Sequence, residues 1–213
     1  MEKVIEKAQA FAMECFAKDH SGHDWFHTLR VFKLATTLAE KEGAQVHTVQ
    51  LAALLHDVDD VKLSPNTHVN KDNARSFLQE NGIAPEMIET ICHIIDQVSF
   101  KGTDSVTPDS LEGMCVQDAD RLDAIGAIGI ARTFAFGGNR GQAMYDPEIP
   151  PQKDLNAQAY QNHKATTINH FYEKLLLLKD MMNTQSAKAL AQSRHAFMED
   201  FLREFMEEWN SIC

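Results

Sequence analysis

Apolar residues recur every three or four positions along most of this 213-residue chain, and this spacing restricts the fold more than any other feature. We find no convincing alternation of apolar and polar residues of the kind that is typical of a half-buried strand. The pattern predicts helices over residues 2–17, 24–41, 48–60, 70–80, 85–100, from about 111 past 130, 159–183 and 186–209. We therefore expect an all-α bundle of about eight helices.

The helical pattern breaks over residues 137–156, which contain three glycines and three prolines. A loop of this length inside a compact domain is usually a lid, a binding loop or a disordered segment, and a domain boundary is the other interpretation. The helical pair that follows, over about residues 159–209, is too short to form a core of its own. We therefore expect residues 1–213 to form a single domain.

The chain is acidic, with 20 lysines and arginines against 31 aspartates and glutamates, which gives a formal net charge of −11. A nucleic acid polymer needs a basic binding face, so we do not expect one as a partner. A small phosphorylated substrate remains compatible with this charge, because a single bound metal ion can reverse the local field.

The four cysteines show no CxxC spacing, and we interpret them as reduced thiols of a cytosolic protein. The N-terminus lacks the pattern of a signal peptide, and no apolar run approaches the roughly 18 residues of a membrane span. We therefore expect a soluble, cytoplasmic protein that has no membrane partner.

The segment LLHDVDD, over residues 54–60, places a histidine and three aspartates directly after an apolar run. The helix predicted over residues 24–41 adds further imidazoles at its start, because His23 and His27 are four positions apart and share a face. A third polar group lies within an apolar segment and comprises Asp118, Asp120 and Asp123.

Several carboxylates near a core are costly unless they are paired or bind a metal ion. Mixed imidazole and carboxylate ligands suit Mn, Fe, Ni, Co or Zn, and Mg less well. The motif HExxH is absent, so a zinc protease of that kind is excluded. Core histidines, helix-capping aspartates and an aspartate paired with Arg121 are the alternatives, and spacing alone leaves them open.

The sequence resembles the HD-domain metal-dependent phosphohydrolases, whose signature is H…HD…D on an all-helical bundle. The resemblance rests on three segments in order, HDWFHTLRV, LAALLHDVDD and QDADRLDAIGAIGIART, within a core of about residues 20–135. The later segments HFYEKLLLLKDMMNT and FMEDFLREFMEEW are similar to the bacterial YpgQ/YedJ-like branch of this superfamily.

The resemblance implies that His27, His56, Asp57 and Asp120 bind one divalent metal ion, which could be Mn, Co, Ni, Fe, Mg or Zn. Asp120 is the expected last ligand because the family uses the aspartate of an Ala-Asp pair at this point. Asp123 shares a helix face with Asp120, so it could hold a ligand histidine in place. An intrahelical or arginine-paired carboxylate is the alternative for Asp123.

The resemblance further implies that Asp60 handles the attacking water, since family members with nucleotidase or pppGpp-hydrolase activity have an acidic residue shortly after the HD pair. A capping or solvated aspartate is the alternative. For the phosphate groups of a substrate we expect contacts from His23, Lys101 and Arg121. Each of these three could instead be a solvated or ion-paired residue.

No glycine-rich phosphate loop of the form GxxxxGK[ST] or GxGxxG occurs, so metal and side chains must hold any nucleotide. The YpgQ/YedJ-like branch is similar to enzymes that split nucleoside triphosphates into monophosphate and pyrophosphate, and this is our leading hypothesis. A nucleoside 5'-monophosphate phosphatase and a non-catalytic, metal-dependent nucleotide sensor are the alternatives. The oligomeric state, monomer or homodimer, stays open.

Overall fold

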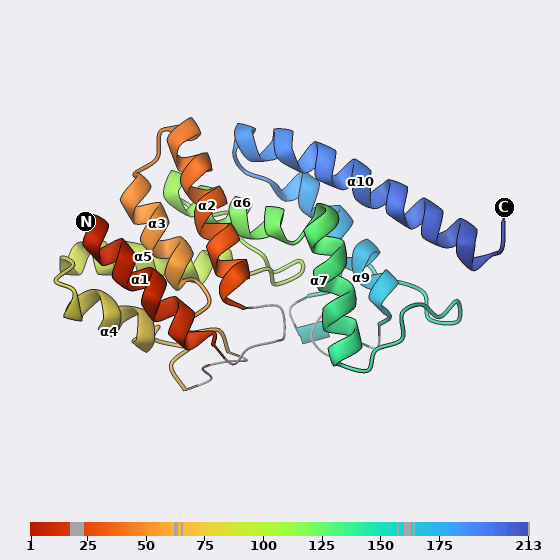
Figure 1. Cartoon of the computed structure of the whole chain (residues 1–213), viewed down its shortest axis with the longest axis horizontal. Coiled ribbons are helices and arrows are strands. Elements are labelled where there is room, and N and C mark those ends of the chain that lie inside the picture. The colour runs from red at the N-terminus through yellow and green to blue at the C-terminus, as the bar shows by residue number, and fades with distance from the viewer. Residues whose placement is uncertain are drawn as a thin grey trace. The chain divides into compact units, whose positions relative to one another are not determined.

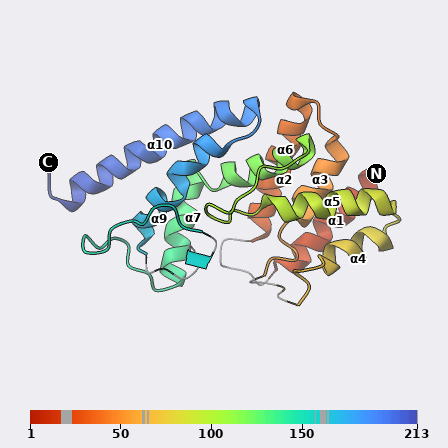
Figure 2. The same cartoon turned by 180° about the vertical axis from the view of Figure 1, so that it is seen from behind.

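The computed structural model describes residues 1–17, 24–61, 64, 66–156, 158–159, 163 and 165–212. Within these residues the chain forms nine α-helices, one 3-10 helix and a single isolated β-bridge, between Gly102 and Asn156 (Figures 1 and 2). The predicted all-α class is therefore confirmed. None of the described helices combines the length and the apolar character that crossing a membrane requires.

The chain divides into two compact units. Unit 1 comprises Met1–Phe100 and Ser105–Asp120, and unit 2 comprises Lys101–Asp104 and Arg121–Cys213. Helix α6 (Leu111–Asp123) therefore belongs to unit 1 over most of its length, and its last residues belong to unit 2.

Unit 1 is built around the helix α3, which contacts α1, α2 and α5. Residues 51–55 of α3 are all fully buried, as expected for a helix that is apolar on every side. Helix α4 packs against α5 (Figure 2). The bounds of these helices are α1 Glu2–Cys15, α2 Trp25–Glu42, α3 Val46–Leu55, α4 Asp72–Glu80 and α5 Pro85–Val98.

Unit 2 is organised by the long helix α10, which contacts α7 and the 3-10 helix η1. Its core is aromatic: the Phe171 ring stacks on Phe201, and Phe134 lies against both. Helix α9 contacts α7 and η1. The bounds of these elements are α7 Gly126–Asn139, α9 Thr167–Glu173, η1 Leu175–Met181 and α10 Gln185–Trp209.

The helix predicted over residues 48–60 is wrong at its C-terminal end, because α3 ends at Leu55. Residues 56–59 form turns in which the Val58 amide donates to Leu55 O and the Asp60 amide donates to Asp57 O. The histidine and aspartates therefore lie on a turn that directly follows a buried helix.

The helix predicted from residue 111 past 130 is two helices, α6 and α7, which meet at Gly126. Gly126 has a φ of 78°, a left-handed conformation that other residues rarely adopt. A Cβ atom at Gly126 would lie 3.0 Å from Cγ of Arg194. The apolar periodicity continues across this break, which is why the sequence pattern did not indicate it.

The helix predicted over residues 159–183 is also wrong, although residues 160–162 and 164 lie outside the described part. Helix α9 begins only at Thr167, because the Thr166 side chain caps it by accepting a hydrogen bond from the Asn169 amide. Lys174, with φ −139° and ψ −61°, then separates α9 from η1. The next helix, α10, agrees with its predicted range to within one residue.

Candidate metal centre

His27 lies in the first turn of α2, where the helix cap fixes its backbone. The Asp24 carboxylate accepts a hydrogen bond from the His27 amide, with 2.8 Å between Oδ1 and N. This satisfies an amide that has no partner within the helix. The His27 side chain is only 1% exposed. Sequence reasoning missed this role of Asp24, although an aspartate immediately before an amphipathic helical run is a capping signal.

His56 and Asp57 follow α3 directly, and a local hydrogen bond fixes the His56 ring. The ring atom Nδ1 lies 2.8 Å from the Ala53 carbonyl oxygen. A carbonyl only accepts, so Nδ1 carries the proton and Nε2 of the neutral ring keeps its lone pair. Nε2 is buried and makes no hydrogen bond within the described residues. A ring held by a backbone carbonyl in this way is typical of metal-ligating histidines.

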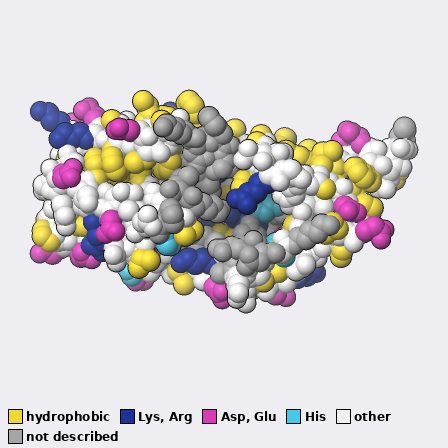
Figure 3. Space-filling view, turned by 90° about the horizontal axis from the view of Figure 1, so that it is seen from below, with side chains coloured by type: hydrophobic (Ala, Val, Ile, Leu, Met, Phe, Trp, Pro, Cys, Tyr) yellow, Lys and Arg dark blue, Asp and Glu magenta, His cyan; other side chains and the backbone are white. Residues whose placement is uncertain are grey.

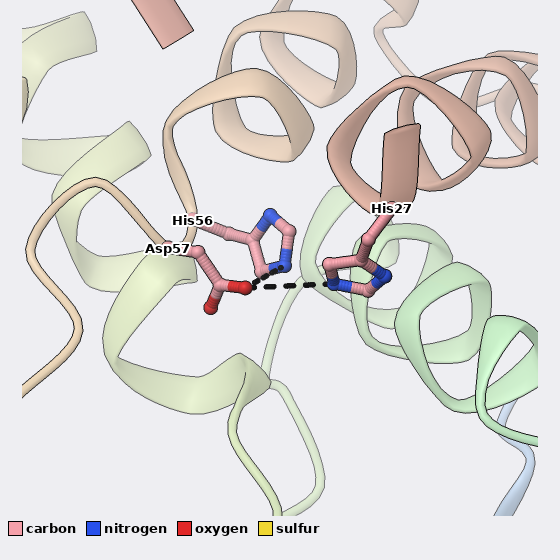
Figure 4. Close-up of side chains that lie close together, drawn as sticks. All are labelled: His27, His56 and Asp57. Atoms are coloured by element: carbon pink, nitrogen blue, oxygen red, sulfur yellow. Dashed lines mark ion pairs between the residues drawn. The ribbon is translucent and has the colours of Figure 1, made fainter. Parts of the chain in front are cut away.

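Four side chains from three parts of unit 1 converge here. Oδ2 of Asp57 lies 3.3 Å from Nε2 of His56 and 3.5 Å from Nε2 of His27, so one carboxylate oxygen lies close to both ring nitrogens (Figure 4). From α6, Oδ1 of Asp120 lies 3.5 Å from His27 Nε2 and 3.9 Å from His56 Nε2. The structure thus brings together the four side chains that the sequence singled out as ligands.

The donor atoms of this cluster suit a divalent cation. Neighbouring ligands about 2.1 Å from one ion lie about 3.0 Å apart in octahedral geometry and about 3.4 Å apart in tetrahedral geometry. The spacings of 3.3–3.9 Å are close to these values. The ligand atoms of His27, His56 and Asp57 all lie within 4.8 Å of one another. Two nitrogens and two carboxylate oxygens do not select one metal.

The negative charge of the cluster acts on the His56 ring. Without a bound ion, burial alone would lower the pKa of His56, but the charges of Asp57 and Asp120 and the hydrogen bond to the Ala53 carbonyl raise this pKa to about 9. The site therefore favours positive charge between its two carboxylates.

The structure gives the two aspartates after the HD pair different surroundings. The Asp59 carboxylate is 1% exposed and accepts hydrogen bonds from two amides in the first turn of α4, those of Asn73 and Ala74. Asp60 is half-buried at the end of the turn. Helix capping therefore accounts for Asp59, and Asp60 stays the candidate for handling water.

The residues predicted to contact substrate phosphates are described to different extents. His23 lies outside the described residues. Lys101 is exposed in unit 2, at the start of the segment that forms the β-bridge. Arg121 is buried, and its guanidinium donates a hydrogen bond to the Met181 carbonyl. Substrate contact stays a prediction for all three.

Asp123 forms an ion pair with Arg132, with 2.7 Å between Oδ2 and the guanidinium nitrogen. Asp123 is 3% exposed, and Arg132 also lies 3.5 Å from its carbonyl oxygen. This contact corresponds to the arginine-paired alternative. A role in holding a ligand histidine stays a prediction.

Comparisons with known proteins agree with this geometry. The family model described as HD domain matches residues 25–125. The chain is 40% identical over 208 residues to the protein YpgQ of Bacillus subtilis, covering 97% of this chain and 94% of that protein.

Two solved structures are similar over nearly the full length. An HD-superfamily hydrolase from Bacillus thuringiensis is 45% identical, with a TM-score of 0.76 and 98% of both chains covered. The structure of Bacillus subtilis YpgQ in complex with ADP is 37% identical, with a TM-score of 0.76 and 96% and 97% of the chains covered. The chain therefore belongs to the HD-domain family, and its predicted resemblance to the YpgQ-like branch is confirmed.

Proposed function

We propose that the protein is a metal-dependent phosphohydrolase that converts nucleoside or deoxynucleoside triphosphates into monophosphate and pyrophosphate. The convergence of two imidazole nitrogens and two carboxylate oxygens at 3.3–3.9 Å carries this proposal. The arrangement offers nitrogen and oxygen ligands and no thiolate. Structural zinc sites are usually closed and rich in thiolates, so this ligand set favours a catalytic ion.

His27, His56, Asp57 and Asp120 hold the divalent ion in this proposal. When bound, such an ion supplies positive charge that lowers the pKa of water and polarises a phosphoryl oxygen. The Asp120 side chain is 26% exposed, whereas that of Asp57 is 8% exposed and those of the histidines are at most 3% exposed. Solvent and substrate therefore approach on the side of Asp120.

Asp60 orients the attacking water and accepts its proton. The water oxygen forms a bond to the α-phosphorus while the bond from that phosphorus to the bridging oxygen breaks. The bridging oxygen keeps the electron pair and leaves as part of pyrophosphate. Asp60 suits this role because it lies three residues after Asp57 on the same turn and is half-buried.

A nucleotide substrate is supported by the relative whose structure was solved in complex with ADP. The acidic net charge of −11 does not favour a nucleic acid polymer. In the described part of the face shown in Figure 3, lysine and arginine side chains form small separate groups. Groups of that size suit a single nucleotide better than an extended phosphate backbone.

The experiment is a screen for released phosphate and pyrophosphate after the metal has been stripped from the protein. Mn, Co, Ni, Mg or Zn is then added back, and nucleoside mono-, di- and triphosphates are offered in turn. Asp57→Ala serves as the control that lacks one ligand. We expect metal-dependent release of pyrophosphate from triphosphates by the wild type alone.

Other outcomes separate the alternatives. Phosphate released only from monophosphates would replace the proposal by a nucleoside 5'-monophosphate phosphatase. Metal-dependent nucleotide binding without turnover of any substrate would replace it by a sensor. Turnover that survives in Asp57→Ala would contradict the assigned site.

A further inference from the structure

We propose that Asp59 and Asn73 are positioning residues that hold the turn between the ligand Asp57 and the water-handling residue Asp60. The inference rests on the proposed function for the roles of Asp57 and Asp60. The observation behind it is a polar network that ties this turn to the first turn of α4.

Asp59 makes three hydrogen bonds to a segment more than eight residues later in the chain. Its side-chain oxygens accept from the amides of Asn73 at 3.1 Å and Ala74 at 3.0 Å. Its carbonyl oxygen accepts from Nδ1 of His68 at 2.8 Å. A carboxylate at a helix N-terminus is stabilised by the amides and by the helix dipole. Both the side chain and the backbone of Asp59 are thereby held.

Asn73 holds the neighbouring residue. Its side-chain amide donates to the Val58 carbonyl oxygen at 3.1 Å and to Oγ1 of Thr67 at 3.2 Å, and it lies 3.5 Å from Oγ of Ser64. Val58 and Asp59 are the two residues between Asp57 and Asp60. Helix α4 therefore holds every residue that separates the metal ligand from the water-handling residue.

The connecting segment is itself fixed at its far end. Lys71 is only 6% exposed, and its ammonium group contacts the His68 carbonyl at 2.6 Å and the Asp96 carboxylate on α5 at 2.6 Å. Lys71 has a φ of 57°, which is strained for a residue with a side chain. Such strain persists only where surrounding contacts determine the conformation, and it is common at functional sites.

Loss of this network should lower the metal affinity of the site more than it lowers the stability of the fold. Residues that orient metal ligands without touching the ion typically change affinity or activity ten- to a hundredfold when they are replaced. Here helix α4 would orient Asp57 through the backbone of residues 58 and 59. A turn released from α4 would let Asp57 leave its position beside the two imidazoles, while the buried helix α3 stays in place.

The test uses Asn73→Ala, which removes the side-chain bonds and places a strong helix former in α4. Asn81→Ala is the matched control at the other end of the same helix. There the side-chain amide donates to the Phe77 carbonyl at 2.8 Å, and the side-chain oxygen accepts from Lys7 at 2.9 Å. Asn81 thus loses comparable bonds without touching the turn.

Co²⁺ binding to metal-stripped protein is followed by its visible absorption, which reports both affinity and coordination geometry. We expect Asn73→Ala to raise the dissociation constant ten- to a hundredfold and to change the absorption bands, as is typical of lost ligand support. Asn81→Ala should match the wild type in both. Asp59→Asn, which keeps the side-chain volume, should act like Asn73→Ala and serves if that variant does not fold.

The network would be merely structural if folded Asn73→Ala and Asp59→Asn bound Co²⁺ with wild-type affinity and spectrum, and this result would overturn the inference. The inference would also be overturned if Asn81→Ala weakened Co²⁺ binding as much as Asn73→Ala. A wild type that binds no Co²⁺ would contradict the metal site of the proposed function itself. The two failures are therefore distinguishable without any substrate.

Discussion

Both units of the molecule bring histidines next to buried carboxylates, but at different distances. In unit 2, Nε2 of His163 lies 2.7 Å from Oε2 of Glu173, and Oε1 of Glu173 accepts from the Gln152 amide at 3.0 Å. These are ordinary hydrogen-bond lengths. In unit 1, the imidazole nitrogens lie 3.3–3.9 Å from the carboxylate oxygens of Asp57 and Asp120. That spacing is typical of groups arranged around an ion.

The different nitrogen–oxygen distances indicate different roles for the two clusters. The pair in unit 2 is a completed interaction, in which a donor meets an acceptor, so its loss should cost stability. The cluster in unit 1 combines two carboxylates with two imidazoles whose Nε2 atoms lie close to them. Its loss should cost metal binding and activity. Substitutions in the unit 1 cluster should therefore lower metal affinity and leave stability nearly unchanged, and substitutions in the unit 2 pair should do the reverse.

The largest effect is expected for Asp57→Ala. Loss of the central ligand should abolish Mn²⁺ binding and lower metal-dependent turnover by more than about a thousandfold, because an ion contributes several kcal/mol to the transition state. Helicity should be kept, since Asp57 lies on the turn after α3. Calorimetric Mn²⁺ titration and circular dichroism check both parts.

The control for that variant is Asp109→Ala, an exposed aspartate of unit 1 that pairs with His93. It should match the wild type in metal binding and in rate. Equal Mn²⁺ affinity of Asp57→Ala and the wild type would break the comparison, because the unit 1 cluster would then be a structural pair like that of unit 2.

The next largest effect is expected for Asp60→Asn. Removing the proton acceptor should lower kcat by about a hundredfold or more, as is usual for a general base, while Mn²⁺ affinity stays within about twofold. Asp72→Asn, an exposed acidic residue in the first turn of α4, is the matched control. A normal rate for Asp60→Asn would mean that another group handles the water.

The sequence indicated the proximity of the four ligand candidates because each lies in a recognisable context. His27 opens an amphipathic helix, His56 and Asp57 follow an apolar run, and Asp120 lies in an apolar segment. The order of these contexts resembles the H…HD…D signature of the HD-domain phosphohydrolases, and this resemblance, more than spacing alone, pointed to one shared site. The all-helical class was equally accessible, because apolar spacing dominates the chain.

The different contacts of Asp59 and Asp60 could not be predicted in the same way. The two residues are adjacent and chemically identical, and they differ only in the contacts that folding provides. Asp59 meets the amides of Asn73 and Ala74, which are 14 and 15 positions away. Local patterns do not encode such a contact, and the same limit applied to the helix break at Gly126.

A smaller effect is expected for Glu173→Gln in unit 2. Glu173 is 6% exposed, and loss of its charge weakens the hydrogen bond to His163. A charge-assisted bond of this kind is worth about 2 kcal/mol, so its weakening should lower the free energy of unfolding by up to that amount. Denaturant titration measures it, and Mn²⁺ affinity should stay unchanged.

Glu199→Gln is the matched control for Glu173→Gln. Glu199 also faces a histidine, with 3.3 Å to Nε2 of His195, but its side chain is 61% exposed. An exposed ion pair contributes about 0–1 kcal/mol, so this variant should be close to the wild type. If both substitutions lowered the free energy of unfolding by the same amount, burial would not explain the contribution of the Glu173–His163 pair.

The smallest effect is expected for Thr184→Ala, which sharpens the comparison because it weakens unit 2 without changing any charge. The Thr184 hydroxyl caps α10 by accepting a hydrogen bond from the Ala187 amide at 3.3 Å. Loss of such a cap costs about 1 kcal/mol, and Thr184→Ser should recover most of it. Thermal unfolding measures the loss.

Because all four ligand candidates belong to unit 1, Mn²⁺ affinity should be the same in both variants. Weaker Mn²⁺ binding by Thr184→Ala alone would show that the order of unit 2 supports the site in unit 1.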